Sequence, residues 1–168
     1  LPDACEAIHP TLLTWDFLQF GGPVVQSAML QELSDKMSLG ECLTLGSVIE
    51  RLANSLGTHI AYQSKVTDAF STSDDALRAG AGVCQDFAHI TLGLLRLHGI
   101  PCRYVNGYLH VENVAKPSES HAWIEVWSPT MGWVGFDPTH SCIIGQRYVV
   151  VAYGRDYSDV PPNRGIFR

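Results

Sequence analysis

The chain has 168 residues, of which 46% are hydrophobic and 17% are charged, and its formal net charge is −6. This length suits one domain with its own hydrophobic core, and the apolar content argues against intrinsic disorder. The acidic balance argues against a general nucleic-acid binder, which needs a basic patch, and no apolar run is long enough to cross a bilayer. We therefore expect neither nucleic acid nor a membrane among the partners.

Five cysteines are scattered along the chain, at positions 5, 42, 84, 102 and 142. Their odd number is not typical of a disulfide framework, and without a C-x-x-C pair a structural zinc site is not indicated. We expect free thiols in a reducing compartment and hence a cytoplasmic location. The chain begins with Leu1 and shows no basic-then-apolar leader, so we expect a processed chain or a piece of a longer one.

The first 58 residues have the pattern of helices. Apolar residues recur at three- and four-residue spacings over 24–37 and 44–56, and Gly57 is a candidate C-cap for the second helix. Residues 59–64 fit a short extended piece. Asp74 and Asp75 precede a short helix that we expect to end near Gly80.

A longer helix is predicted to begin at or just before Cys84. Phe87, Ile90, Leu94 and Leu97 recur at helical spacing, and Gly99 suits the C-terminal cap. This helix is apolar enough to be largely buried.

The period changes to two after this helix, which predicts strands over 102–109, 120–127, 132–137 and 147–153, with turns over 113–119 and 128–131 and a turn-rich tail over 154–168. Helices followed by an antiparallel sheet make an α+β fold. Since no linker is visible, we expect one domain over 1–168, with a mainly helical lead-in over 1–58 and a catalytic core over 59–168.

Cys84 stands where the buried helix should begin. A thiol is a nucleophile as its thiolate, and a helix N-terminus favours negative charge. Gly80 and Gly82 let the backbone approach closely and leave room beside the sulfur. The alternative is that Cys84 is one more small buried hydrophobe.

His121 and Asp137 lie on the second and third predicted strands. Both are odd-numbered, so a hairpin with a three- or five-residue loop puts them on one face, directly opposed or diagonal. A two- or four-residue loop would separate them. A thiol, an imidazole and a carboxylate supply a nucleophile, its base and the group that orients the base.

Three motifs carry a family resemblance. They are Gly82-Val83-Cys84-Gln85-Asp86-Phe87-Ala88-His89, Ser120-His121-Ala122-Trp123-Ile124-Glu125-Val126-Trp127 and Gly132-Trp133-Val134-Gly135-Phe136-Asp137-Pro138-Thr139. In this order they resemble the core motifs of the transglutaminase-like superfamily, and more narrowly its bacterial members described as cysteine proteases. The likeness covers about residues 60–168.

The resemblance implies a papain-like α+β fold in which a cysteine at a helix N-terminus faces histidine and aspartate on a sheet. It implies Cys84 as nucleophile, His121 as general base and then acid, and Asp137 as orienter. It also implies an oxyanion donor upstream of the cysteine, for which Tyr62 and Gln63 are candidates and Tyr62 is preferred. No loop resembles a calcium site, so we expect no metal and no cofactor.

Three residues near these positions are candidates for a substrate pocket, and a metal site is an alternative interpretation. Asp86, Trp123 and His140 are candidates for the substrate pocket, with a helix-cap acid, a core aromatic and a surface histidine as their plainer explanations. A zinc site of Cys84, His121 and Asp137 is a weaker alternative, because no metal-ligand motif accompanies it.

These residues predict a thiol-dependent amide hydrolase, a cysteine peptidase or amidase, that acts on peptide or protein amides through a thioester. A protein-glutamine acyltransferase with an amine acceptor and a non-catalytic binding module of the same fold are alternatives. Acyl-CoA-dependent arylamine acetylation is a weaker one, because the sequence around Cys84 is less like that family.

Overall fold

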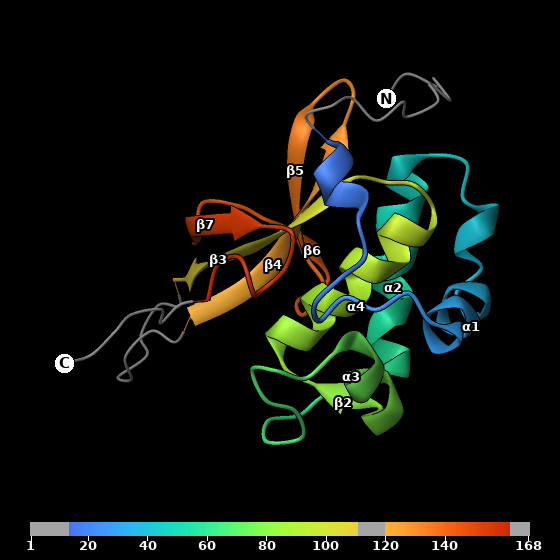
Figure 1. The fold of residues 1–168 in the computed structure, drawn as a ribbon. Coiled ribbons are helices and arrows are strands. Elements are labelled where there is room, and N and C mark those ends of the chain that lie inside the picture. The colour runs from blue at the N-terminus through green and yellow to red at the C-terminus, as the bar shows by residue number, and fades with distance from the viewer. Residues whose placement is uncertain (1–13, 111–119, 162–168) are drawn as a thin grey trace.

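The computed structural model describes residues 14–110 and 120–161. As expected, helices come first along the chain and a sheet follows (Figure 1). The helices are α1 (Ala28–Lys36), α2 (Leu45–His59), α3 (Ser73–Ala79) and α4 (Cys84–Leu97), with 3₁₀ helices at Trp15–Leu18 and Leu39–Glu41. The strands are β1 (Ala61–Tyr62), β2 (Ala81–Gly82), β3 (Cys102–Leu109), β4 (Ser120–Ser128), β5 (Gly132–Asp137), β6 (Cys142–Ile143) and β7 (Tyr148–Gly154).

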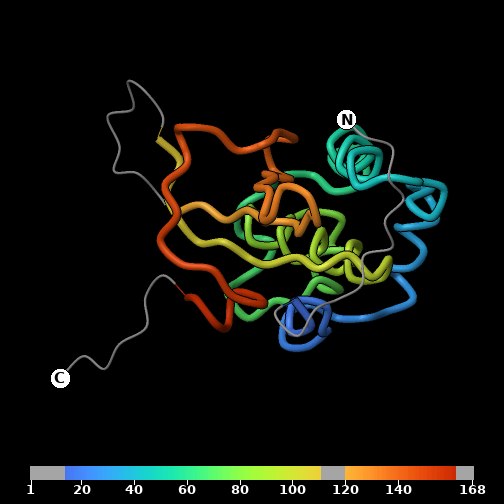
Figure 2. Tube along the Cα trace, turned by 90° about the horizontal axis from the view of Figure 1, so that it is seen from above, coloured from blue at the N-terminus to red at the C-terminus, as the bar shows by residue number. Residues whose placement is uncertain are grey.

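The main sheet has the strand order β6-β5-β4-β3-β7, and every neighbouring pair is antiparallel. The short strands β1 and β2 form a separate parallel pair. Figure 1 shows the long helices gathered to one side of the sheet, and Figure 2 shows the same arrangement from above. Among the described residues, no helix is long and apolar enough to span a membrane.

Helix α4 is the central element, because it packs against β3 and β4 on one side and against α1 and α3 on the other. Its start is fixed by Asp86, whose Oδ2 accepts a hydrogen bond of 2.7 Å from the N–H of Val83. It ends where Gly99 takes a φ of +67°, a conformation that glycine adopts at low cost. Every residue from 86 to 96 is buried.

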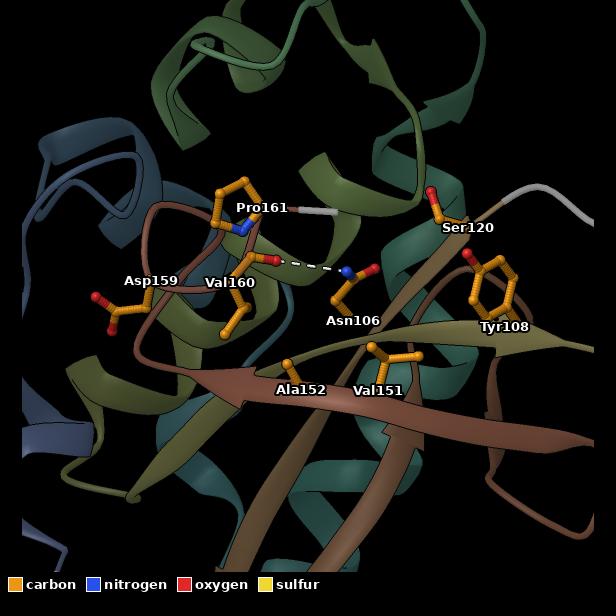
Figure 3. A pocket seen from close by; sticks show the side chains of 8 residues that line it. All are labelled: Asn106, Tyr108, Ser120, Val151, Ala152, Asp159, Val160 and Pro161. Carbon is orange, nitrogen blue, oxygen red and sulfur yellow. Dashed lines mark hydrogen bonds between the residues drawn. The ribbon is translucent and has the colours of Figure 1, made fainter. Parts of the chain in front are cut away.

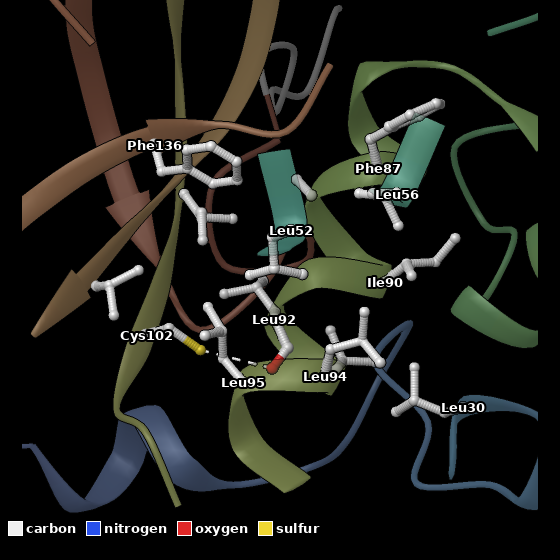
Figure 4. Close-up of a cluster of buried hydrophobic side chains, with 14 of the residues drawn as sticks. Leu30, Leu52, Leu56, Phe87, Ile90, Leu92, Leu94, Leu95, Cys102 and Phe136 are labelled. Carbon is white, nitrogen blue, oxygen red and sulfur yellow. Dashed lines mark hydrogen bonds between the residues drawn. The ribbon is translucent and has the colours of Figure 1, made fainter. Parts of the chain in front are cut away.

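One buried cluster joins the helices to the sheet. Leu52 of α2, Leu92 of α4 and Phe136 of β5 are at most 1% exposed. They pack with the other residues of the cluster shown in Figure 4. Replacing Leu92 by Ala would cost about 2–5 kcal/mol, through lost burial and the cavity left behind. The helical lead-in and the sheet share this core, which supports our proposal of one domain.

The β4–β5 hairpin has the register that brings His121 and Asp137 to one face. Trp127 pairs with Trp133 and Ile124 with Phe136, so position 121 lies diagonal to position 137. This is the register expected for a five-residue loop, although pairing of residues 128 and 132 shortens the loop to three residues.

Gly107 permits a close approach inside the curled sheet. A Cβ there would lie 2.5 Å from the ring of Trp123 and would also collide with the carbonyl oxygen of Val149. The packing of β7 and Trp123 against β3 therefore requires glycine at this position.

Some predicted details are wrong. Gly57 is not a cap, because α2 continues through it to His59. The short strands β2 and β6 and the 3₁₀ helices were not predicted, since two or three residues carry too little periodicity. The predicted turn over 113–119 and the last part of the tail, 162–168, lie outside the described residues. The four cysteines among the described residues, Cys42, Cys84, Cys102 and Cys142, are free thiols.

Candidate active site

Cys84 is the first residue of α4, and its side chain is partly buried. The N–H groups of a first helical turn carry partial positive charge, and here those of Asp86 and Phe87 donate to the carbonyl oxygen of Val83 at 2.9 and 3.1 Å. The chain reaches Cys84 directly from β2, where a Cβ on Gly82 would lie 2.5 Å from the Asp86 carboxylate. Glycine at 82 and Asp86 as the cap therefore fix the position of the thiol.

His121 and Asp137 form a direct hydrogen bond. Nε2 of His121 lies 2.7 Å from Oδ2 of Asp137, and the two side chains are 11% and 0% exposed. Cys84 lies close enough to His121 to contribute to a raised pKa of its ring. Since Nε2 is engaged with Asp137, Nδ1 is the ring nitrogen left for the thiol. The structure thus joins His121 to Asp137, and Cys84 as the third member of the group stays a prediction.

The carboxylate of Asp137 accepts more hydrogen bonds than a triad needs. Besides His121, Oδ2 accepts hydrogen bonds of 2.8 Å from Nδ1 of His140 and from the hydroxyl of Tyr148. Oδ1 accepts from the backbone N–H groups of Thr139 and His140, at 2.8 and 3.2 Å. Burial alone would raise the pKa of Asp137, but the bonds from His121 and His140 outweigh it and hold that pKa well below its usual value.

The same contacts act on His121 in the opposite direction. Burial lowers the pKa of its ring, but the hydrogen bond to Asp137 and the nearby Cys84 outweigh burial and raise that pKa from 6.5 to about 9. His121 is therefore a cation at neutral pH.

Of the two further side chains that contact Asp137, His140 was predicted from the sequence and Tyr148 was not. His140 was a pocket candidate, and its side chain is half exposed, with the ring centre 5.2 Å from that of His121. Tyr148 was missed. It reaches Asp137 from β7, which pairs with β3 and not with β5, so no local motif connects the two residues.

Asp86 and Trp123 are corrections to the predicted pocket. Asp86 is 1% exposed, and its Oδ2 is occupied by Val83 and by the Thr67 hydroxyl at 2.6 Å, so it caps the helix. Trp123 is fully buried, and its ring packs against His121 and Tyr148. Neither side chain is available to a bound substrate in this structure. Asp86 instead caps the helix that begins at Cys84, and Trp123 packs against His121.

Tyr62, the predicted oxyanion donor, lies on β1 opposite Gly82 of β2 and is 62% exposed. This register puts it beside the two residues that lead into Cys84. The next residue, Gln63, donates its backbone N–H to the carbonyl oxygen of Gly82 at 2.8 Å. Both candidates are thus near the nucleophile, and Tyr62 stays a prediction.

His121, Asp137 and His140 also have donor atoms within 4.8 Å of one another, as a metal site would need. This set does not include Cys84, whereas the zinc site considered from the sequence did. Nε2 of His121 and Nδ1 of His140 lie 2.7 and 2.8 Å from Oδ2 of Asp137, which are hydrogen-bond distances. An ion bound to all three would have to displace these bonds, so the present geometry fits a hydrogen-bonded group better.

Comparisons with known proteins find similar sequences. A sequence model described as the transglutaminase-like superfamily matches residues 31–138. An uncharacterized protein of Mycobacterium leprae is 50% identical over 111 residues, which are 63% of this chain and 39% of that protein. An uncharacterized protein of Mycobacterium tuberculosis is 39% identical over 132 residues, 73% of this chain and 42% of that protein. The chain thus spans about two fifths of these relatives.

Solved structures extend the likeness to the fold. A proposed cysteine protease from Cytophaga hutchinsonii has a TM-score of 0.78 at 29% identity, over 93% of this chain and 52% of that chain. The periplasmic domain of TgpA from Pseudomonas aeruginosa has a TM-score of 0.59 at 25% identity, over 76% of this chain and 47% of that one. The predicted α+β fold with an antiparallel sheet is confirmed.

Proposed function

Because the chain belongs to the transglutaminase-like superfamily, we propose that it is a thiol-dependent amide hydrolase acting on peptide or protein substrates. Cys84 is the nucleophile, His121 the base and acid, and Asp137 the orienting carboxylate. The observation that carries the proposal is the 2.7 Å contact between His121 and Asp137. Cys84 stands near this pair, at the N-terminus of α4.

In the first step, the thiol proton is held on Nδ1 of His121 and the sulfur attacks the carbonyl carbon of the amide. The negative charge that develops on the carbonyl oxygen is stabilised by the backbone N–H of Cys84. The hydroxyl of Tyr62 is the proposed second donor. Asp137 keeps His121 in position and stabilises its cationic form.

In the second step, His121 gives its proton to the departing amine nitrogen as the C–N bond breaks, which leaves a thioester on Cys84. Water then attacks the thioester carbonyl while His121 takes its proton. The C–S bond breaks, the acid product leaves, and the proton returns to the thiolate–imidazole pair.

Alkylation of single cysteines tests the nucleophile directly. Iodoacetamide at mildly acidic pH should modify Cys84 far faster than Cys42, Cys102 or Cys142, because thiolate is the reacting form. The rate at Cys84 should fall in His121→Ala and stay unchanged in His59→Ala, a control at an exposed position at the end of α2. Equal rates at all four cysteines would overturn the proposed mechanism.

A second candidate differs only in what resolves the thioester. A protein-glutamine gamma-glutamyltransferase of Pseudomonas aeruginosa is 34% identical over 89 residues, 48% of this chain and 13% of that protein. A labelled amine and a glutamine peptide distinguish the two reactions. Ammonia release that outpaces amine incorporation supports hydrolysis, and the reverse supports a transglutaminase. Neither product, with an unreactive Cys84, would indicate a binding module.

A further inference from the structure

A pocket that the proposed chemistry does not use lies between β3, β7 and the segment that follows β7. It has a volume of about 250 Å³ and is lined by Asn106, Tyr108, Ser120, Val151, Ala152, Asp159, Val160 and Pro161. Figure 3 shows Val151 and Ala152 on β7, with Asp159 and Val160 toward one end of the pocket and Tyr108 and Ser120 toward the other. A volume of this size suits one side chain rather than a whole cofactor.

The pocket lies on the face of β3 and β4 against which α4 packs, since Tyr104 and Ile124 on that face belong to the core shared with α4. Ser120 directly precedes His121 on β4 and pairs with Tyr108 of β3, so its side chain points to the opposite face from the imidazole. Tyr108 shares its face of β3 with Tyr104, four residues or about 13 Å earlier along the strand. Burial and then the nearby charge of Cys84 raise the pKa of Tyr104, so this row of side chains leads from the pocket toward the nucleophile.

One end of the pocket offers hydrogen-bonding groups that the described residues do not use. The carboxamide of Asn106 is 7% exposed, and Nδ2 makes its one hydrogen bond among the described residues, to the Val160 carbonyl oxygen at 3.4 Å. An asparagine side chain has a second N–H and an acceptor oxygen to offer. The hydroxyls of Ser120 and Tyr108 make no hydrogen bond with the described part of the chain. These groups suit a ligand that both donates and accepts.

The walls of the pocket are apolar, and its acidic residue is already paired. Val151, Val160 and Pro161 supply aliphatic surface. The carboxylate of Asp159 accepts hydrogen bonds of 2.9 Å from the backbone N–H, Nε and Nη2 of Arg155. Because Arg155 balances the charge of Asp159, the pocket has no charge left to compensate the desolvation of a charged ligand group. Binding of a charged group in the pocket is therefore disfavoured.

We propose that this pocket is a specificity subsite that binds an uncharged substrate side chain with an aliphatic stem and an amide or hydroxyl tip. The side chain belongs to a residue beside the one whose amide reacts. The proposal rests on the proposed function, because it assigns the pocket to the same peptide substrate.

The test varies one substrate residue at a time on either side of the reacting amide, using Gln, Leu, Lys and Glu. For the wild-type chain, we expect one position at which kcat/KM is about tenfold higher with Gln than with Lys or Glu. Val151→Trp should abolish that selectivity, because its ring fills the pocket. Val149→Trp is the matched control, since Val149 lies on the same strand, is similarly exposed and does not line the pocket.

A second variant pair tests the polar end. Ser120→Ala with Tyr108→Phe should lower the preference for Gln over Leu and leave the iodoacetamide rate at Cys84 unchanged. A reactive Cys84 with no selectivity at any position, or with selectivity that survives Val151→Trp, overturns the subsite alone. A Cys84 no more reactive than Cys42, with no peptide turned over, overturns the proposed function and the subsite with it.

Discussion

Asp137 holds His121 through Nε2 at 2.7 Å, and this leaves Nδ1 of the ring for the proposed contact with Cys84. The contact therefore fixes both the orientation of the imidazole and its tautomer when neutral. Asp137 can do so because it is fully buried and its other oxygen is held by two backbone N–H groups. The carboxylate is itself held in place before it orients the base.

Asp137→Asn should lower kcat by about 10³–10⁴-fold, because an amide at this position can hold His121 in the wrong tautomer. Steady-state kinetics and the iodoacetamide rate at Cys84 measure the effect. Asp35→Asn, at an exposed position on α1, is the control. A change of less than tenfold in Asp137→Asn would contradict the role of the carboxylate.

Tyr148→Phe should have a smaller effect of the same kind. The substitution removes one donor at 2.8 Å from Asp137 and leaves the donors from His121 and His140 in place. A hydrogen bond to a charged group contributes about 1.5–3 kcal/mol, so we expect roughly a tenfold loss in kcat/KM.

The pH profile separates this effect from a packing defect. With one donor fewer, the pKa of Asp137 should rise, and the acid limb of kcat/KM should move to higher pH. Tyr153→Phe, at an exposed position on the same strand, should leave the limb where it is. An unshifted limb in Tyr148→Phe would show that the hydroxyl does not act on the carboxylate.

Stability should depend on pH through His121. Below about pH 6.5 the ring is protonated in both states, so its full stabilising contribution is present. Between 6.5 and the folded pKa of about 9, the unfolded chain loses the proton first and stability falls. Asp137 has a lowered pKa, so its contribution is present above 3.8 and is lost as the pH falls below that value.

Urea unfolding from pH 5 to 10 measures this dependence. We expect the wild-type chain to lose on the order of 2–3 kcal/mol between pH 6.5 and 9.5 relative to His121→Gln. The difference between the two proteins is the useful quantity, because His89 also titrates, with a pKa lowered to about 3 by burial and by Arg96. Parallel curves for the two proteins would contradict the raised pKa of His121.

The contact between His121 and Asp137 could be predicted from the sequence because a hairpin is local. Alternation along two adjacent strands fixes the shared face once the register is known, and the observed register satisfies it. The start of α4 at Cys84 could also be predicted from the sequence, because the apolar spacing, Gly99 and Pro101 that define this helix all lie within twenty residues.

Tyr148 and Trp123 show what local patterns do not contain. Tyr148 is the first residue of β7, which pairs with β3 and is separated from β5 in the sheet order, yet its hydroxyl reaches Asp137, and alternation along a single strand does not predict such a contact. Trp123 alternates as a groove-lining residue would, but Gly107 and Tyr148 enclose its ring. The sequence pattern predicts to which face of a strand a side chain points, but it does not predict which other residues cover that face.

The last prediction concerns metal. If His121, Asp137 and His140 act as a hydrogen-bonded group, dialysis against EDTA should leave kcat/KM unchanged, and added Zn²⁺ should not be required. His140→Ala separates the two possibilities, because it removes one donor atom from the potential metal site and leaves the hydrogen bond between His121 and Asp137. We expect this variant to keep its activity within about tenfold, as for the loss of one hydrogen bond. Loss of activity on chelation that Zn²⁺ restores in the wild-type chain, but not in His140→Ala, would show that the three side chains hold a metal instead.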